Sequence, residues 1–102
     1  MPVPVFEVLA QDSRRRILDL IAAAERPVGE LVNELGLSQP AVSKHLRVLR
    51  DAGLVDVRVD GQRRLYRVLP EPLREVDEWL TPYRRMWAQR LEALERHLDR
   101  MR

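Results

Sequence analysis

Cationic and hydrogen-bonding side chains gather in the middle of the chain, at a spacing that suits recognition of double-stranded DNA. Ser43, Arg47 and Arg50 are separated by four and three residues, so a helix would place them on one face. A hydroxyl and two guanidinium groups in such a row match the hydrogen-bonding edges of bases in the major groove. A solvated helix face is the alternative interpretation of the same pattern.

The positive charge of the chain is concentrated around these residues. The 102 residues carry 18 basic and 16 acidic side chains, for a net charge of +2. Residues 38–67 hold seven basic and three acidic groups, whereas residues 1–37 are net negative and residues 68–102 are neutral. This distribution favours an anionic partner that meets the middle segment.

The composition argues against several other classes of protein. There is no cysteine, which excludes disulfide scaffolds, thiolate zinc sites and cysteine nucleophiles. There is no glycine-rich phosphate loop, and neither His45 nor His97 has a carboxylate three or four residues away, so we do not expect an enzyme. No apolar run approaches the ~20 residues of a membrane span and the N-terminus is unlike a secretory signal, so we expect a cytoplasmic protein without a membrane partner.

Two helices joined by a short turn position the cationic face. Ser38 is placed to cap a helix over residues 38–52, with Pro40 in its first turn and Gly53 at its end. A preceding helix over residues 28–35 ends at Gly36, which leaves the short connection of a helix-turn-helix. The apolar positions of the 38–52 helix predict its buried side: Ala41, Val42, Leu46, Val48, Leu49 and Ala52.

An earlier amphipathic helix is expected before Pro27. Asp12 or Ser13 is placed to cap it. Ile17, Leu18, Ile21 and Ala24 then recur at helical spacing, which predicts one buried face.

A β-hairpin follows over residues 55–68. Valines alternate with charged residues from Val55 onward, and Asp60-Gly61 favours a two-residue type I′ loop. That loop would place Arg58 opposite Arg63. Like charges that face each other are unfavourable in a sheet, so this pairing would favour an anion at the hairpin tip. The alternatives are that Arg58, Arg63 and Arg64 simply point into water, or that a shift of the register removes the pairing.

The final segment predicts a long helix over about residues 71–101, interrupted at Thr81-Pro82 by a kink or by a new helix start. Thirty helical residues span ~45 Å, which exceeds so small a body. We therefore expect self-association through this helix and an N-terminal helix over about residues 4–11, with an intramolecular core as the alternative. The predicted interface residues are Val5, Phe6, Leu9, Trp79, Tyr83, Trp87, Leu91, Leu94 and Leu98.

The combined order is four helices, two strands and a last helix, in one domain of residues 1–102. This is a mainly α fold with a small β-hairpin, the layout of a winged helix-turn-helix. Residues 13–69 also resemble the ArsR family of bacterial transcriptional regulators. The matching segments are RRRIL (14–18), ELVNELGLSQ (30–39), AVSKHLRVLRDAGLV (41–55) and DGQRRLY (60–66).

The resemblance implies a homodimer that binds a palindromic DNA operator and represses transcription by occupying a promoter. It implies that the 38–52 helix enters the major groove and that the wing, residues 55–68, meets the flanking backbone. The DNA-binding residues that it implies are Ser38, Gln39, Ser43, Lys44, His45, Arg47, Arg50, Arg63 and Arg64.

Many members of that family sense metals, but this sequence lacks the expected ligands. Without cysteine there is no thiolate site, and around His97 the helical neighbours are Leu94, Ala93, Arg100 and Met101. We expect no metal and no cofactor. Two alternatives remain: a nickel or zinc site formed by His97 with Glu92, Glu95 or Asp99 of a second copy, and a winged helix that serves as a protein-interaction module.

Overall fold

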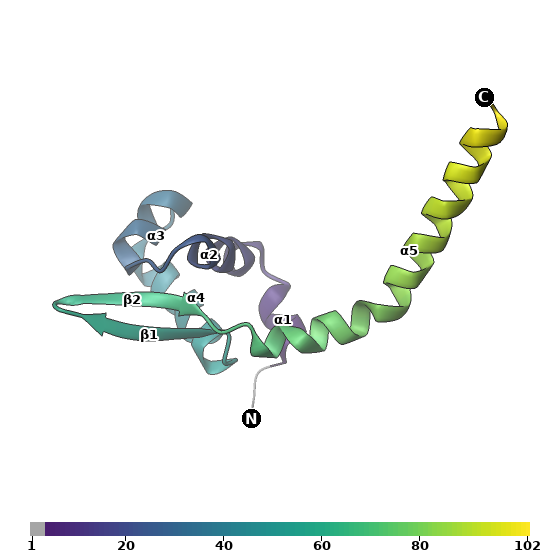
Figure 1. The fold of residues 1–102 in the computed structure, drawn as a ribbon. Helices are drawn as coiled ribbons and strands as arrows, with labels where there is room; N and C mark the ends of the chain where they lie inside the picture. Colours follow the sequence, from purple (N-terminus) through teal and green to yellow (C-terminus); the bar gives the residue numbers. More distant parts are fainter. Residues whose placement is uncertain (1–3) are drawn as a thin grey trace.

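The computed structural model describes residues 4–102 and shows a mainly helical fold with one antiparallel hairpin (Figure 1). The predicted order of elements is confirmed. The elements are α1 (Val5–Leu9), α2 (Asp12–Ala23), α3 (Val28–Leu35), α4 (Gln39–Asp51), β1 (Val55–Asp60), β2 (Arg63–Val68), a 3₁₀ turn (Glu71–Leu73) and α5 (Arg74–Arg100).

The core lies between the first four helices and the base of the hairpin. Most of the predicted faces of α2 and α4 is buried there, and Leu31 of α3 is completely covered. The exceptions are Ala24, which is exposed at the end of α2, and three residues of α4 that are only half-buried: Ala41, Val48 and Ala52. Burial of a large aliphatic side chain contributes about 1.5–3 kcal/mol, so this cluster fixes how α3 and α4 are placed. The fully buried side chains are Val8, Ile17, Leu31, Val42, Leu49, Leu54 and Val55.

The ends of α3 and α4 follow the predicted capping signals. Gly36 ends α3 with φ +67°, a left-handed conformation that a side chain disfavours. Ser38 caps α4, because its hydroxyl oxygen accepts a hydrogen bond from the backbone N–H of Ala41 at 3.2 Å. The turn between the two helices is thus fixed at both sides by local chemistry.

The predicted cap of α2 is wrong. The helix is capped by the backbone of Gln11 and has no side-chain cap. Asp12 lies in the first turn, where its negative charge suits the helix dipole, and it pairs with Arg15 at 3.4 Å. Arg15 also donates to the carbonyl of Leu9 at 2.6 Å, which ties α2 to the end of α1.

The hairpin loop differs from the prediction by one residue. The loop is Gly61-Gln62, so Asp60 faces Arg63 and Arg58 faces Leu65. The expected pairing of Arg58 with Arg63 is therefore wrong. Only Gly61 of the two has a positive φ (+65°), as in a type II′ rather than a type I′ turn. The observed register places opposite charges together at the tip and buries Leu65 against the body.

The long helix α5 runs without a break through Pro82 and leaves the body along its length, bending on the way (Figure 1). The sequence left open a kink or a new helix start at Thr81-Pro82, and the structure excludes the new start because α5 is continuous from Arg74 to Arg100. Pro82 has no N–H to donate to the carbonyl of Glu78. Just before it, the carbonyl of Asp77 accepts hydrogen bonds from the Thr81 hydroxyl at 3.3 Å and from Arg84 at 2.8 Å.

Candidate nucleic-acid interface

The exposed face of α4 carries the side chains that the sequence singled out. Ser43, Lys44, Arg47 and Arg50 are exposed, while Val42, Leu46 and Leu49 on the other side are buried in the core. Because the buried residues hold the helix against α2 and α3, the polar row points outward on a rigid support. Ser38 and Gln39 lie at the exposed start of the same helix.

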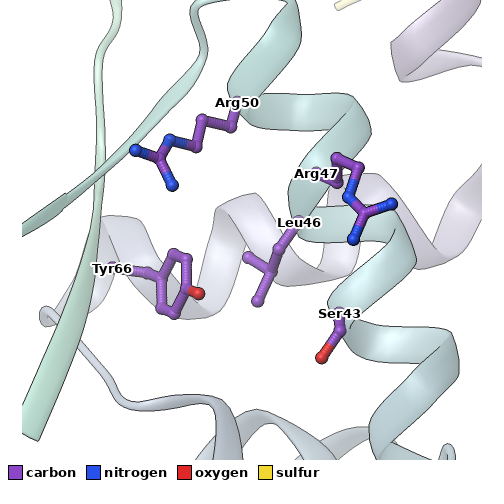
Figure 2. Close-up of a pocket in the computed structure, with 5 residues that line it drawn as sticks. All are labelled: Ser43, Leu46, Arg47, Arg50 and Tyr66. Atoms are coloured by element: carbon purple, nitrogen blue, oxygen red, sulfur yellow. The ribbon is translucent and has the colours of Figure 1, made fainter.

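A small pocket lies between this row and the wing. Its volume is about 200 Å³, and Figure 2 shows Arg47 and Arg50 from α4 around it with the ring of Tyr66 from β2. Ser43 and the buried Leu46 complete the lining. Sequence reasoning missed Tyr66. The alternation of a strand places it on the same face as Arg64, but only the packing of the hairpin on the helices brings it to the cationic row.

The arginines of the wing divide into paired and unpaired groups. Arg58 contacts Glu25 at 2.8 Å, and Arg67 contacts Asp56 at 2.8 Å. Arg63 lies 3.8 Å from Glu30, a longer and exposed pair that offsets little of its charge. Arg64 has no ion pair within residues 4–102. Of the two wing arginines predicted to meet DNA, Arg64 is thus fully available, whereas Arg63 is weakly paired with Glu30 of α3.

Asp56 of β1 is held in its ionised form by its neighbours. The hydrogen bond from Arg67, with a second from the backbone N–H of Val57 at 2.7 Å, holds the pKa of Asp56 below its ordinary value. The positive charge of Arg50 acts in the same direction. Asp56 is therefore ionised, and its carboxylate is held by Arg67. It makes no direct ion pair with Arg50, whose guanidinium has no ion-pair partner within residues 4–102.

His45 is placed differently from the rest of the predicted row. It is half-buried, and its Nδ1 atom is covered without a hydrogen-bond partner in the described part of the chain. Burial lowers its pKa, and the charges of Arg14 and Lys44 lower it further. His45 is therefore a neutral side chain at the edge of the core near neutral pH, and its predicted contact with DNA remains a prediction.

The predicted interface residues also divide into two groups. Val5 is 4% exposed and belongs to the core of its own chain, and Leu9 packs against that core. Phe6 meets the edge of Trp79 with 5.7 Å between ring centroids, so α1 and the start of α5 touch within one chain. The rest of the stripe is uncovered: Trp79, Tyr83, Trp87, Leu91, Leu94 and Leu98 are each 41–60% exposed.

No cluster of three or more metal-ligating side chains is present within residues 4–102. His97 is exposed on α5, beside Ala93, Arg96 and Arg100 in a shallow depression. In the same part of the chain, every helix is too short or too polar to cross a membrane.

Comparison with known proteins identifies the family. The pattern of the arsR family of bacterial regulatory proteins matches residues 11–57, from the start of α2 into β1. The HTH-type transcriptional regulator Rv2034 of Mycobacterium tuberculosis is 37% identical over 96% of this chain and 89% of its own. The arsenic resistance transcriptional regulator ArsR1 of Pseudomonas putida is 43% identical over 79% of this chain and 73% of its own.

A solved structure supports the same assignment. The homodimeric winged helix-turn-helix DNA-binding domain of Mb0332 from Mycobacterium bovis, a possible ArsR-family transcriptional regulator, is 31% identical, with a TM-score of 0.64. The match covers 78% of this chain and 74% of that one. With its winged helix-turn-helix and its relatives, the chain belongs to the arsR family of bacterial regulatory proteins and is a transcriptional regulator, not an enzyme.

Proposed function

We propose that this regulator is a homodimeric repressor that binds a palindromic operator. In this proposal α4 of each subunit lies in the major groove and the wing meets the flanking backbone. The observation that carries the proposal is the row of exposed, unpaired donors on α4, which continues across the pocket to the wing. Occupancy of a promoter by such a dimer excludes RNA polymerase, which is the simplest route to repression.

The exposed stripe of α5 supports the dimer. No residue of α5 is buried, although it presents two tryptophans and several leucines. Apolar surface of this kind is characteristic of a site that another chain covers. A twofold dimer would place two copies of α4 on one side of the duplex, and successive major grooves on that side are ~34 Å apart.

The test of DNA recognition compares substitutions with different expected effects. Operator fragments are first selected from the source genome with the purified protein, and affinity is then measured by fluorescence anisotropy. Arg47→Ala should abolish the preference for the operator over a scrambled duplex, because Arg47 faces the groove. Arg63→Ala should weaken binding to both duplexes alike, because a phosphate contact carries no sequence information. Arg100→Ala, the same charge change at the far end of α5, is the control.

Equal affinity for operator and scrambled duplexes in the wild-type protein would refute the proposal. If the protein also formed oligomers in sedimentation, that result would favour the protein-interaction module instead.

We propose further that DNA binding needs no metal. The side chains around His97 on its own helix are those of Ala93, Arg96 and Arg100, which offer no lone pair to nickel or zinc. Calorimetric titration with nickel and zinc, with His97→Ala as the control, should give no heat at micromolar protein. Site-specific heat that is lost in the variant would instead support the metal-responsive alternative, with His97 and Glu92, Glu95 or Asp99 of a second copy as ligands.

A further inference from the structure

The pocket between α4 and β2 has the chemistry of an anion site. Four of its five lining residues bring hydrogen-bond donors: the Ser43 hydroxyl, the guanidinium groups of Arg47 and Arg50, and the Tyr66 phenol. Leu46 forms the apolar remainder. At about 200 Å³ the pocket is smaller than the roughly 300–1,000 Å³ of sites that enclose drug-sized ligands. Its size and donors suit a single anionic group.

These donors are free to bind such a group. Within residues 4–102, none of the four side chains makes a hydrogen bond or ion pair with another side chain or with the backbone. The nearby Arg67, by contrast, is neutralised by Asp56 at 2.8 Å. Arg47 and Arg50 are therefore not held by a direct contact with a carboxylate in this part of the chain, although the charge of Asp56 acts on Arg50 from a distance.

The position of Tyr66 connects the two parts of the DNA-binding surface. Residues two apart on a strand point to the same face, so Arg64 and Tyr66 form a row on β2. Figure 2 shows the Tyr66 ring turned toward the α4 side chains, with its hydroxyl at the end nearer to them. A DNA strand that passes from the groove at α4 to the wing would cross this pocket.

We propose that the pocket binds one phosphate of the DNA backbone in each half-site, and that the Tyr66 hydroxyl donates a hydrogen bond to it beside Arg50, while Arg47 at the other side of the pocket faces the groove. This inference rests on the proposed function and adds a residue and a specific contact to it. Tyr66 is then a neutral positioning contact, which fixes where α4 sits along the groove.

The test is a scan of the operator in which one phosphate per half-site is replaced by an uncharged methylphosphonate. The protein variant is Tyr66→Phe, which removes the hydroxyl and keeps the ring that packs against the core. On the unmodified operator, Tyr66→Phe should bind about tenfold more weakly per half-site, as expected for loss of a hydrogen bond to a charged group. Its salt dependence should be unchanged, because no charge is removed.

One methylphosphonate position should identify the contact. At that position the wild-type protein should lose about tenfold or more in affinity, and Tyr66→Phe should lose clearly less, because its contact is already missing. Modified phosphates elsewhere in the same half-site are the internal control, and both proteins should respond to them equally. Arg50→Ala should show the same coupling, together with a salt slope lower by ~0.9 per half-site.

Two outcomes would overturn the inference. The first is that Tyr66→Phe binds the operator as tightly as the wild-type protein, or loses affinity without coupling to any phosphate position. The second is that inorganic phosphate weakens DNA binding more than chloride does at equal ionic strength, that Tyr66→Phe removes this difference, and that every methylphosphonate position affects both proteins equally. The pocket would then bind a free phosphate ion and not the DNA backbone. Failure of the proposed function looks different, since the wild-type protein would then not prefer the operator at all.

Discussion

Truncation of two leucines on α5 should dissociate the proposed dimer while leaving each subunit folded. Leu94 and Leu98 are 53% and 49% exposed and lie on one face, four residues apart. Neither belongs to the core, and α5 has no buried residue. The double variant Leu94→Ala/Leu98→Ala therefore removes apolar surface that only a second chain would cover.

The size of the effect follows from the exposed fractions. Complete burial of a leucine side chain contributes about 1.5–3 kcal/mol, and about half of each side chain remains to be covered, so each truncation costs about 1 kcal/mol. A twofold interface contains both positions twice. The total of about 4 kcal/mol raises the dissociation constant of the dimer by about 1,000-fold.

Sedimentation equilibrium over a range of protein concentrations measures this constant directly. Arg96→Ala is the matched control, because Arg96 lies on the same turns of α5 but on the opposite face, and it should leave the constant unchanged. Circular dichroism at high concentration checks that the body remains folded. A double variant that dimerises as tightly as the wild-type protein would refute the placement of the interface on this stripe.

Three further predictions concern the body of the protein. Arg64→Ala should lower the salt slope of DNA binding by ~0.9 per half-site, whereas Arg58→Ala, whose guanidinium is held by Glu25, should change it little, as measured by anisotropy from low to moderate salt. Because the pKa of His45 is lowered in the folded protein, the unfolded chain takes up the proton first as the pH falls. The free energy of unfolding should therefore be highest above pH 6.5 and should decrease as the pH drops toward the pKa of His45 in the folded protein. Urea denaturation of His45→Gln should show a smaller decrease over the same pH range. Ser38→Ala should lower the free energy of unfolding by ~1 kcal/mol through loss of the α4 cap, while Ser43→Ala, inside the helix, should not lower it.

Signals from residues close in sequence correctly predicted the two helices, α3 and α4, that support the candidate interface. The Gly36 turn and the Ser38 cap depend on residues close in sequence, so α3 and α4 could be placed from their own chemistry. The apolar spacing of α4 then determined which side chains face outward. The confirmed parts of the fold are those in which neighbouring residues decide the conformation.

The features that were missed depend on contacts between distant residues. Both Asp60-Gly61 and Gly61-Gln62 can form a two-residue loop, and the observed register pairs Asp60 with Arg63 where the alternative would have opposed Arg58 and Arg63. The pairing of Arg58 with Glu25 joins residues 33 positions apart. Tyr66 reaches the recognition surface only because the hairpin packs against the helices, which places its ring in the same pocket as side chains of α4. No local pattern contains this information.

The proline in α5 has a consequence for the operator itself. Pro82 lies between the part of α5 that contacts the body and the part with the uncovered leucines. In the proposed dimer, the course of α5 sets the orientation of each winged helix-turn-helix relative to the twofold axis. The number of base pairs between the two half-sites would then depend on the shape of a helix outside the proposed DNA-binding surface, and straightening that helix would change which spacing the protein prefers.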